Sequence, residues 1–412
     1  MPTRRSCLNG RRSPMSRPDA RHIRLLTRAA YAGMFVFGIV MALLGAILPS
    51  LAGRLRFEVA DIGTLFLVMN AAMLACSLAL GLAMDRYGMK PPLMLGPLLV
   101  AAGLVIVARA TAFVELLPAV ALLGIGGGAL NGATNTLVAD LHDDPKRKSA
   151  ALNLLGVFFG FGALLLPFAI GALLASFSMG RLLAAAAFLC AAVGVFASAL
   201  RFPAPKQGHA LPIAKVPQFL RSPLVLVFAL LLFFESGVEF TLGGFISTYL
   251  MRAVGVASVS MASWILAGYW ASLMASRAVL SRLALASDPY RTLFLCAAGA
   301  CVGAVLAAVS PAPGFSAFVI VLCGWSLAGI YPTVLGIAGS RFQSHSGTVF
   351  GILFAVALAG GMILPWLAGQ IGGAAGLRWV FAMVAAAFAA ILIVSRVAAR
   401  IDREQSMAAH PS

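Results

Sequence analysis

Charged residues are scarce in this sequence of 412 residues. Asp, Glu, Lys and Arg make up 10% of the chain, whereas soluble domains carry about 25%. Hydrophobic residues make up 61%, and the mean hydropathy is +0.98. A water-soluble fold of this size cannot hide so much apolar surface, so the composition excludes a cytosolic enzyme, a secreted protein and a disordered chain. It indicates a polytopic membrane protein, whose apolar excess is covered by lipid.

The common enzyme motifs are also missing from the sequence. It contains no H-E-x-x-H, no G-x-x-x-x-G-K-[ST] and no C-x-x-C. The five histidines all fall in tails or connectors, and five of the six cysteines lie inside apolar runs as small hydrophobic residues. We therefore expect no enzymatic activity, no metal site and no cofactor.

Acidic residues are few, and the formal net charge is +17. Eight of the basic residues precede Ala29, and most others lie in short connectors between apolar runs. This distribution is typical of the cytoplasmic face of a membrane protein and excludes nucleic acid as a partner. Residues 1–28 are predicted to be a disordered basic cytoplasmic tail, and either Met1 or Met15 is a possible start of translation.

Long apolar runs dominate the rest of the chain. Because about 20 apolar residues span a bilayer as a helix, these runs predict an all-α protein with twelve transmembrane helices. The predicted spans are 29–51, 62–83, 93–111, 115–140, 149–175, 180–200, 223–250, 258–283, 290–310, 314–338, 346–371 and 375–398.

The basic residues predict the orientation of these spans. With twelve spans, the face that carries both tails receives 24 of the 30 Lys and Arg residues. The positive-inside rule then places both termini in the cytoplasm and the protein in the cell inner membrane. We expect a monomer in the lipid bilayer.

The spans divide into two groups of six. Residues 201–222 form the longest polar stretch inside the chain and are predicted to be a cytoplasmic linker between an N-terminal bundle, 29–200, and a C-terminal bundle, 223–398, with residues 399–412 as a cytoplasmic tail. A Pro-x-x-x-Gly pattern at Pro167 recurs at Pro365, 198 positions later. Repeated six-helix halves predict two pseudo-symmetric bundles with a binding site between them.

Two acidic residues fall well inside a predicted span. Glu235 and Glu239 would lie roughly 18 and 24 Å into a core about 30 Å thick, at 1.5 Å per helical residue. Their i, i+4 spacing puts them on one helix face. Two such carboxylates do not both ionise in a low dielectric, so at least one is expected to carry a proton. We interpret the pair as proton-coupling groups and Glu239 also as a substrate ligand, although interhelical hydrogen bonding alone is an alternative.

Several polar and aromatic residues inside the spans suit a neutral sugar. Carboxamides offer paired donors and acceptors for hydroxyl groups, and an aromatic ring stacks on the apolar face of a sugar. Packing between helices is the alternative role for the amides. Besides Glu239, the predicted substrate-binding residues are Asn131, Asn135, Asn153 and Trp270.

The connector after the second predicted span, residues 81–90, reads GLAMDRYGMK. It resembles the G-x-L-A-D-R-x-G-R-K signature of the major facilitator superfamily at the same location. The resemblance implies the twelve-helix major facilitator fold and a conformational gate. The matching residues are Gly81, Asp85, Arg86, Gly88 and Lys90, and Arg277 near the end of the eighth span is predicted to belong to the same gate.

Motifs in both halves are similar to those of the fucose–galactose–glucose:proton symporter branch. They include FFESGVE at 233–239, GYW at 268–270, YPT at 331–333 and SGTVFG at 346–351. The resemblance implies a secondary transporter that takes up a sugar or similar small polar solute with protons by alternating access. A proton-coupled efflux carrier for drugs or metabolites, and a non-transporting membrane receptor or scaffold, are the alternatives.

Overall fold

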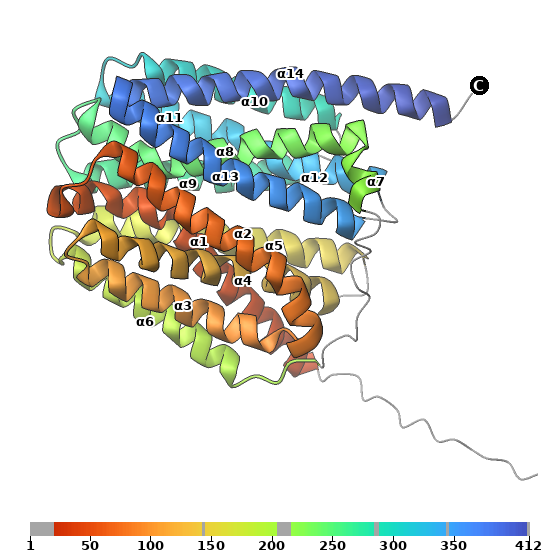
Figure 1. Cartoon of the computed structure of the whole chain (residues 1–412), viewed down its shortest axis with the longest axis horizontal. Coiled ribbons are helices and arrows are strands. Elements are labelled where there is room, and N and C mark those ends of the chain that lie inside the picture. The colour runs from red at the N-terminus through yellow and green to blue at the C-terminus, as the bar shows by residue number, and fades with distance from the viewer. Residues whose placement is uncertain (1–19, 142–144, 204–215, 284–287, 343–345, 410–412) are drawn as a thin grey trace, which may run out of the picture.

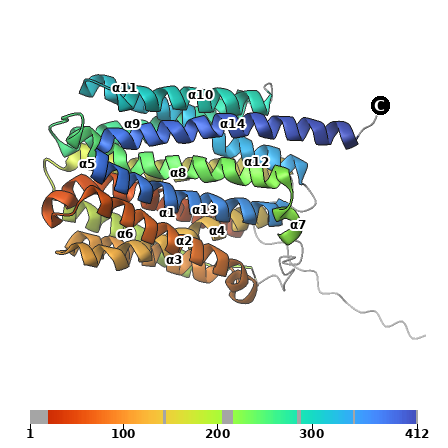
Figure 2. The same ribbon diagram turned by 45° about the horizontal axis from the view of Figure 1, so that its top comes forward.

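The structure is a computed structural model that describes residues 20–141, 145–203, 216–283, 288–342 and 346–409. Within these ranges every regular element is a helix, and the long helices run side by side along the length of the molecule (Figures 1 and 2). The helices are α1 (Ala20–Leu55), α2 (Val59–Tyr87), α3 (Lys90–Arg109), η1 (Phe113–Glu115), α4 (Leu116–Leu141), α5 (Pro145–Leu173), α6 (Met179–Ser198), α7 (Val216–Leu220), α8 (Pro223–Arg252), α9 (Val259–Leu283), α10 (Pro289–Ala308), α11 (Pro313–Leu327), α12 (Ile330–Arg341), α13 (Ser346–Ala375) and α14 (Leu377–Ala409).

Eleven segments of the described chain are long and apolar enough to cross a membrane. They correspond to eleven of the twelve predicted spans. The remaining predicted span is helix α9, whose polar positions, including Arg277, lower its hydropathy. The all-helical membrane fold predicted from the apolar runs is therefore confirmed. We call the side where α1 begins and α14 ends the terminal side of the bundle.

The helix boundaries differ from the predicted ones at both ends and in the tenth span. Helix α1 begins at Ala20, within the stretch predicted to be disordered, and α14 runs to Ala409, beyond the predicted end at 398. Both extensions are amphipathic, so an apolar-run criterion misses them. The predicted linker contains the short helix α7, while residues 1–19 and 204–215 lie outside the described part. The tenth span, predicted as one helix, is divided into α11 and α12.

The two halves repeat the same helix contacts. On α5, Gly162 packs against the backbone carbonyl of Phe35 on α1. On α13, Gly360 packs in the same way against the carbonyl of Phe233 on α8. Both residues of the second contact stand 198 positions after their counterparts, so the repeat seen in the sequence is also a repeat of packing.

The halves touch each other on the side opposite the termini. Gly45 of α1 packs on the backbone of Gly243 of α8, and a Cβ at Gly63 of α2 would lie 2.9 Å from the carbonyl oxygen of Pro365 on α13. The ring of Phe168 on α5 is 5.0 Å from that of Trp264 on α9. Small residues let backbones of opposing helices approach closely here.

The same helix faces separate toward the terminal side. On α5, a Cβ at Gly160 would meet Met274 of α9, but one turn closer to the terminal side a Cβ at Gly156 would meet no atom within 4 Å. Asn153, the next residue on this face, is exposed. On α13, a Cβ at Gly351 would likewise meet no atom within 4 Å. The interface between the halves is thus closed on one side and open on the terminal side.

Candidate functional site

The predicted acid pair is buried in the middle of α8. The residues of α8 from 235 to 250 are all buried, and Glu235 and Glu239 are 1% and 7% exposed. Neither carboxylate oxygen of Glu235 has a hydrogen-bond partner among the described residues, and its charged neighbours are Glu239 and Arg277. A buried ionised carboxylate without a partner is costly, and the proton-coupling role of Glu235 stays a prediction.

Arg277 connects Glu239 to two other parts of the molecule. Its Nη2 atom lies 3.6 Å from Oε2 of Glu239, and its Nε donates to the carbonyl oxygen of Ala328 at 3.4 Å. Its guanidinium carbon is also 5.9 Å from the ring centroid of Phe159, which belongs to α5 of the other half. One arginine therefore contacts the acid pair, the break between α11 and α12, and the opposing half.

Pro332 explains why the Ala328 carbonyl is available to Arg277. In a continuous helix that carbonyl would accept a hydrogen bond from the N–H of residue 332, but proline has none. Helix α11 ends at Leu327, and α12 begins at Ile330. The Arg277 side chain supplies the missing donor. The sequence prediction included the Tyr331-Pro332-Thr333 motif but not the helix break, for which Pro332 was the available signal.

Replacing this proline tests whether the break serves transport. In Pro332→Ala the chain regains the N–H, which competes with Arg277 for the Ala328 carbonyl. Because this added hydrogen bond can join α11 and α12 into one helix, we expect a higher melting temperature together with a several-fold slower transport rate. Thermal unfolding and initial rates in proteoliposomes measure the two effects. An unchanged rate would show that the break is not used in the transport cycle, and a faster rate would show that it slows transport rather than serving it.

Trp270 packs against Phe159 and Gly243 and is not open to a ligand in this state. It is 2% exposed, its ring packs edge-on against Phe159 at 6.4 Å, and a Cβ at Gly243 would lie 3.1 Å from it. Its indole Nε1 and the hydroxyl of neighbouring Tyr269 are buried without a hydrogen-bond partner among the described residues. Sequence reasoning singled out Trp270 and passed over the role of Phe159.

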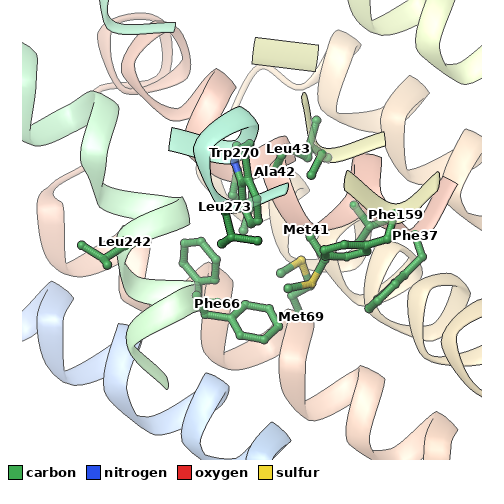
Figure 3. Close-up of a cluster of buried hydrophobic side chains, with 14 of the residues drawn as sticks. Phe37, Met41, Ala42, Leu43, Phe66, Met69, Phe159, Leu242, Trp270 and Leu273 are labelled. Carbon is green, nitrogen blue, oxygen red and sulfur yellow. The ribbon is translucent and has the colours of Figure 1, made fainter. Parts of the chain in front are cut away.

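The wall that the N-terminal half presents to this region is apolar. Figure 3 shows Phe37, Met41 and Met69 beside Phe159, with Trp270 from α9 close by. Phe37 and Met41 stand 198 positions before Glu235 and Glu239, so the repeat places apolar residues where the second half has acids. Within the described chain, the acidic residues at this depth all belong to the C-terminal half.

The predicted amides lie on the N-terminal half. The Nδ2 atom of Asn135 donates to the backbone carbonyl of Asn131 at 2.8 Å and lies 3.2 Å from its Oδ1 atom. Asn135 and Asn153 are exposed, and Asn131 is half-buried. Asn153 lies on the face of α5 that opens toward the terminal side. By contrast, Asn70 is fully buried and donates to the carbonyl of Phe66, while its Oδ1 atom has no hydrogen-bond partner among the described residues.

The predicted gate motif forms the connection from α2 to α3. Gly88 caps α2 with φ of 76°, a conformation that favours glycine, and its N–H donates to the Met84 carbonyl at 2.8 Å. Arg86 has its guanidinium 5.3 Å from the ring of Tyr87, and Lys90 begins α3. The surroundings of Gly81 and the side chain of Asp85 lie outside the described part, so the gate role of these two residues stays a prediction. Among the described residues there is no cluster of three or more metal-ligating side chains.

Known proteins share both sequence and architecture with this chain. The family model described as Major Facilitator Superfamily matches residues 30–252 and 228–411. An uncharacterized MFS-type transporter, YfkL of Bacillus subtilis (strain 168), is 25% identical over 375 residues, which cover 85% of this chain and 90% of that protein.

Two solved structures show the fold. A bacterial homologue of the human lysosomal transporter Spinster, inward-facing and unoccupied, aligns with a TM-score of 0.76 at 15% identity over 92% of this chain and 98% of that one. The E. coli fucose:proton symporter FucP aligns with a TM-score of 0.64 at 18% identity over 92% and 99%. The sequence match across both halves, with the repeated helix packing, shows that this chain belongs to the major facilitator superfamily of membrane transporters, which are not enzymes.

Proposed function

We propose that this transporter takes up a sugar or a similar small polar solute together with protons. The observation that carries the proposal is the buried pair of Glu235 and Glu239, one without a hydrogen-bond partner among the described residues and the other 3.6 Å from Arg277. An intramembrane carboxylate is costly, and its usual justification is a role in moving protons or substrate. The likeness to FucP, described as a fucose:proton symporter, supports the same function.

The proposed coupling uses the competition between a proton and Arg277 for Glu239. When the interface faces the cytoplasm, which we assign to the terminal side, Arg277 is partly exposed and pairs with an ionised Glu239. A proton that reaches Glu239 from the other side removes this pair and frees Arg277 from the carboxylate. Arg277 then changes its contacts with Ala328 and Phe159, and this change favours one conformation of the two halves over the other.

The proposed substrate contacts lie on the open face of the N-terminal half. Asn135 and Asn153 are exposed there, and their amides suit hydroxyl groups. Asn131 positions the Asn135 amide by their hydrogen bond. Trp270 would contribute its ring only after the halves separate around Phe159, so we place it in the opposite conformation of the cycle.

Replacing an amide tests the substrate class. We expect Asn135→Ala to raise the KM for the transported solute about tenfold, because each hydrogen bond to a neutral group is worth about 1 kcal/mol and Asn135 offers up to two. The protein should reach the membrane at normal levels, since the side chain is exposed. Initial uptake rates in proteoliposomes across a panel of neutral sugars, polyols and amphipathic amines give the KM and identify the solute. An unchanged KM assigns Asn135 to packing, and transport of amines without sugars contradicts the proposed class.

Efflux of an amphipathic solute is the second candidate function. The observation that favours it is the apolar surface of Phe37, Met41 and Met69, which lie beside Phe159 in Figure 3, the ring that Arg277 approaches. A solute with an apolar body and a polar group would contact this surface with its apolar body. The direction of coupling separates the two functions: a symporter accumulates its solute in vesicles with an acidic exterior, whereas an antiporter accumulates it in vesicles with an acidic interior.

A further inference from the structure

One face of helix α14 changes from apolar to basic near its C-terminal end. Ile393 and Val397 are exposed apolar residues, 65% and 44% exposed. At helical spacing, Arg396, Arg400 and Arg403 continue the same face. Counting about 20 residues across the hydrocarbon core from the start of α14 places its boundary near Val397. The arginines therefore lie at the level of the lipid headgroups.

The opposite face of α14 is fixed to the protein. Ser395, Ala398 and Asp402 are buried along it. Asp402 pairs with Arg341 of α12, with Nε to Oδ1 at 2.6 Å and Nη2 to Oδ2 at 2.8 Å. This bidentate pair holds the extension of α14 in place, so the arginine face points away from the bundle in a defined orientation.

Helix α10 adds a second wall beside the arginines. The guanidinium carbon of Arg396 lies 4.8 Å from the ring centroid of Phe294, and Arg291, one turn earlier on the same side of α10, is exposed. Leu295, which is 59% exposed, lies one turn further along α10, on the side of the hydrocarbon core. A shallow groove of about 420 Å³ runs along α14 and is lined by Arg396, Ala399, Arg400, Arg403, Glu404 and Met407.

We propose that this groove, with its arginines Arg396, Arg400 and Arg403, binds the headgroup of an anionic glycerophospholipid. The three guanidinium groups that line the groove exceed the single negative charge of Glu404, and guanidinium groups bind phosphate well. Glu404 pairs with Arg400 at 2.8 Å, but both side chains are largely exposed, so phosphate competes easily for Arg400. The acyl chains of this lipid would pack against the exposed apolar residues Leu295, Ile393 and Val397. Cationic residues at the headgroup level above an exposed apolar face match the two parts of such a lipid.

The test measures which lipids stay bound to the purified full-length protein. Native mass spectrometry is run with phosphatidylglycerol, with phosphatidylcholine and with inorganic phosphate as a competitor. We expect selective retention of phosphatidylglycerol, and at least a fivefold loss of it in Arg400→Gln/Arg403→Gln. The matched control Arg24→Gln/Arg28→Gln removes two exposed arginines from α1 on the same side of the bundle and should leave retention unchanged. Glu404→Gln should increase retention.

Three outcomes overturn the proposal. Equal losses in both double variants would show general attraction to the basic side of the protein rather than a site. Equal retention of phosphatidylcholine would remove the role of charge, and complete displacement by millimolar inorganic phosphate would indicate a site for a soluble anion. Because Glu404→Gln removes only an exposed carboxylate, it keeps the proposal testable if the arginine variant folds poorly.

Discussion

Glu239→Gln is expected to abolish uphill transport while leaving downhill exchange in place. A proton gradient of one pH unit corresponds to about 1.4 kcal/mol, which supports up to a tenfold accumulation for each proton coupled. Without a titratable group at 239, the accumulation ratio should fall to about one, and the pH dependence of uptake should flatten. Accumulation of the solute in proteoliposomes with an imposed pH gradient measures the first effect, and exchange of labelled for unlabelled solute measures the second.

The structure supplies the controls for this variant. Glutamine keeps an oxygen that can accept a hydrogen bond from Arg277, but leaves that cation without its 3.6 Å carboxylate partner. Removing one partner of this partly buried pair can also destabilise the fold, so Glu239→Gln/Arg277→Gln is included to separate lost coupling from lost folding. Glu58→Gln removes an exposed carboxylate just before α2 and should behave as the wild type. Full accumulation by Glu239→Gln would exclude Glu239 from coupling and leave Glu235 as the remaining acid of the pair.

The sequence is sufficient to predict the features that depend on composition and spacing. The apolar runs predict the helices because lipid demands about 20 apolar residues for each span. The burial of Glu235 and Glu239 is also confirmed, since their i, i+4 positions lie far from either end of α8. The family was predicted from motifs that are local in sequence, such as the turn around Gly88, and the family model that matches both halves confirms it.

Features that depend on which helices face each other could not be predicted. The approach of Arg277 to Ala328 joins residues 51 positions apart. Pro332 indicates that the Ala328 carbonyl lacks its helical donor, but no local pattern identifies Arg277 as the group that replaces it. Trp270 was predicted as a ligand from its type, but its exposure is set by Phe159 of the other half. A single sequence also contains no information about which of the two conformations a structure will show.

Adding one methyl group at Gly45 is expected to stop transport without unfolding the protein. In this conformation a Cβ at position 45 would overlap the carbonyl of Gly243, so Gly45→Ala forces α1 and α8 apart on the side opposite the termini. Overpacking of this kind costs about 1–3 kcal/mol. The opposite conformation separates the halves on this side and does not bear that cost. Each 1.4 kcal/mol of difference shifts the equilibrium between the two tenfold, so Gly45→Ala should favour the opposite conformation by up to about a hundredfold.

Thiol labelling measures this shift directly. A cysteine introduced at Asn135, which is exposed in the present conformation, should react several-fold more slowly with a soluble reagent in the Gly45→Ala background. Gly53→Ala is the matched control on the same helix, because a Cβ at position 53 would meet no atom within 4 Å, and it should transport and label normally. If Gly45→Ala slows labelling and transport while Gly53→Ala does neither, the contact of α1 with α8 is a closing contact of the transport cycle. Equal labelling in both variants would mean that this contact persists in every conformation and that the halves rock about it instead.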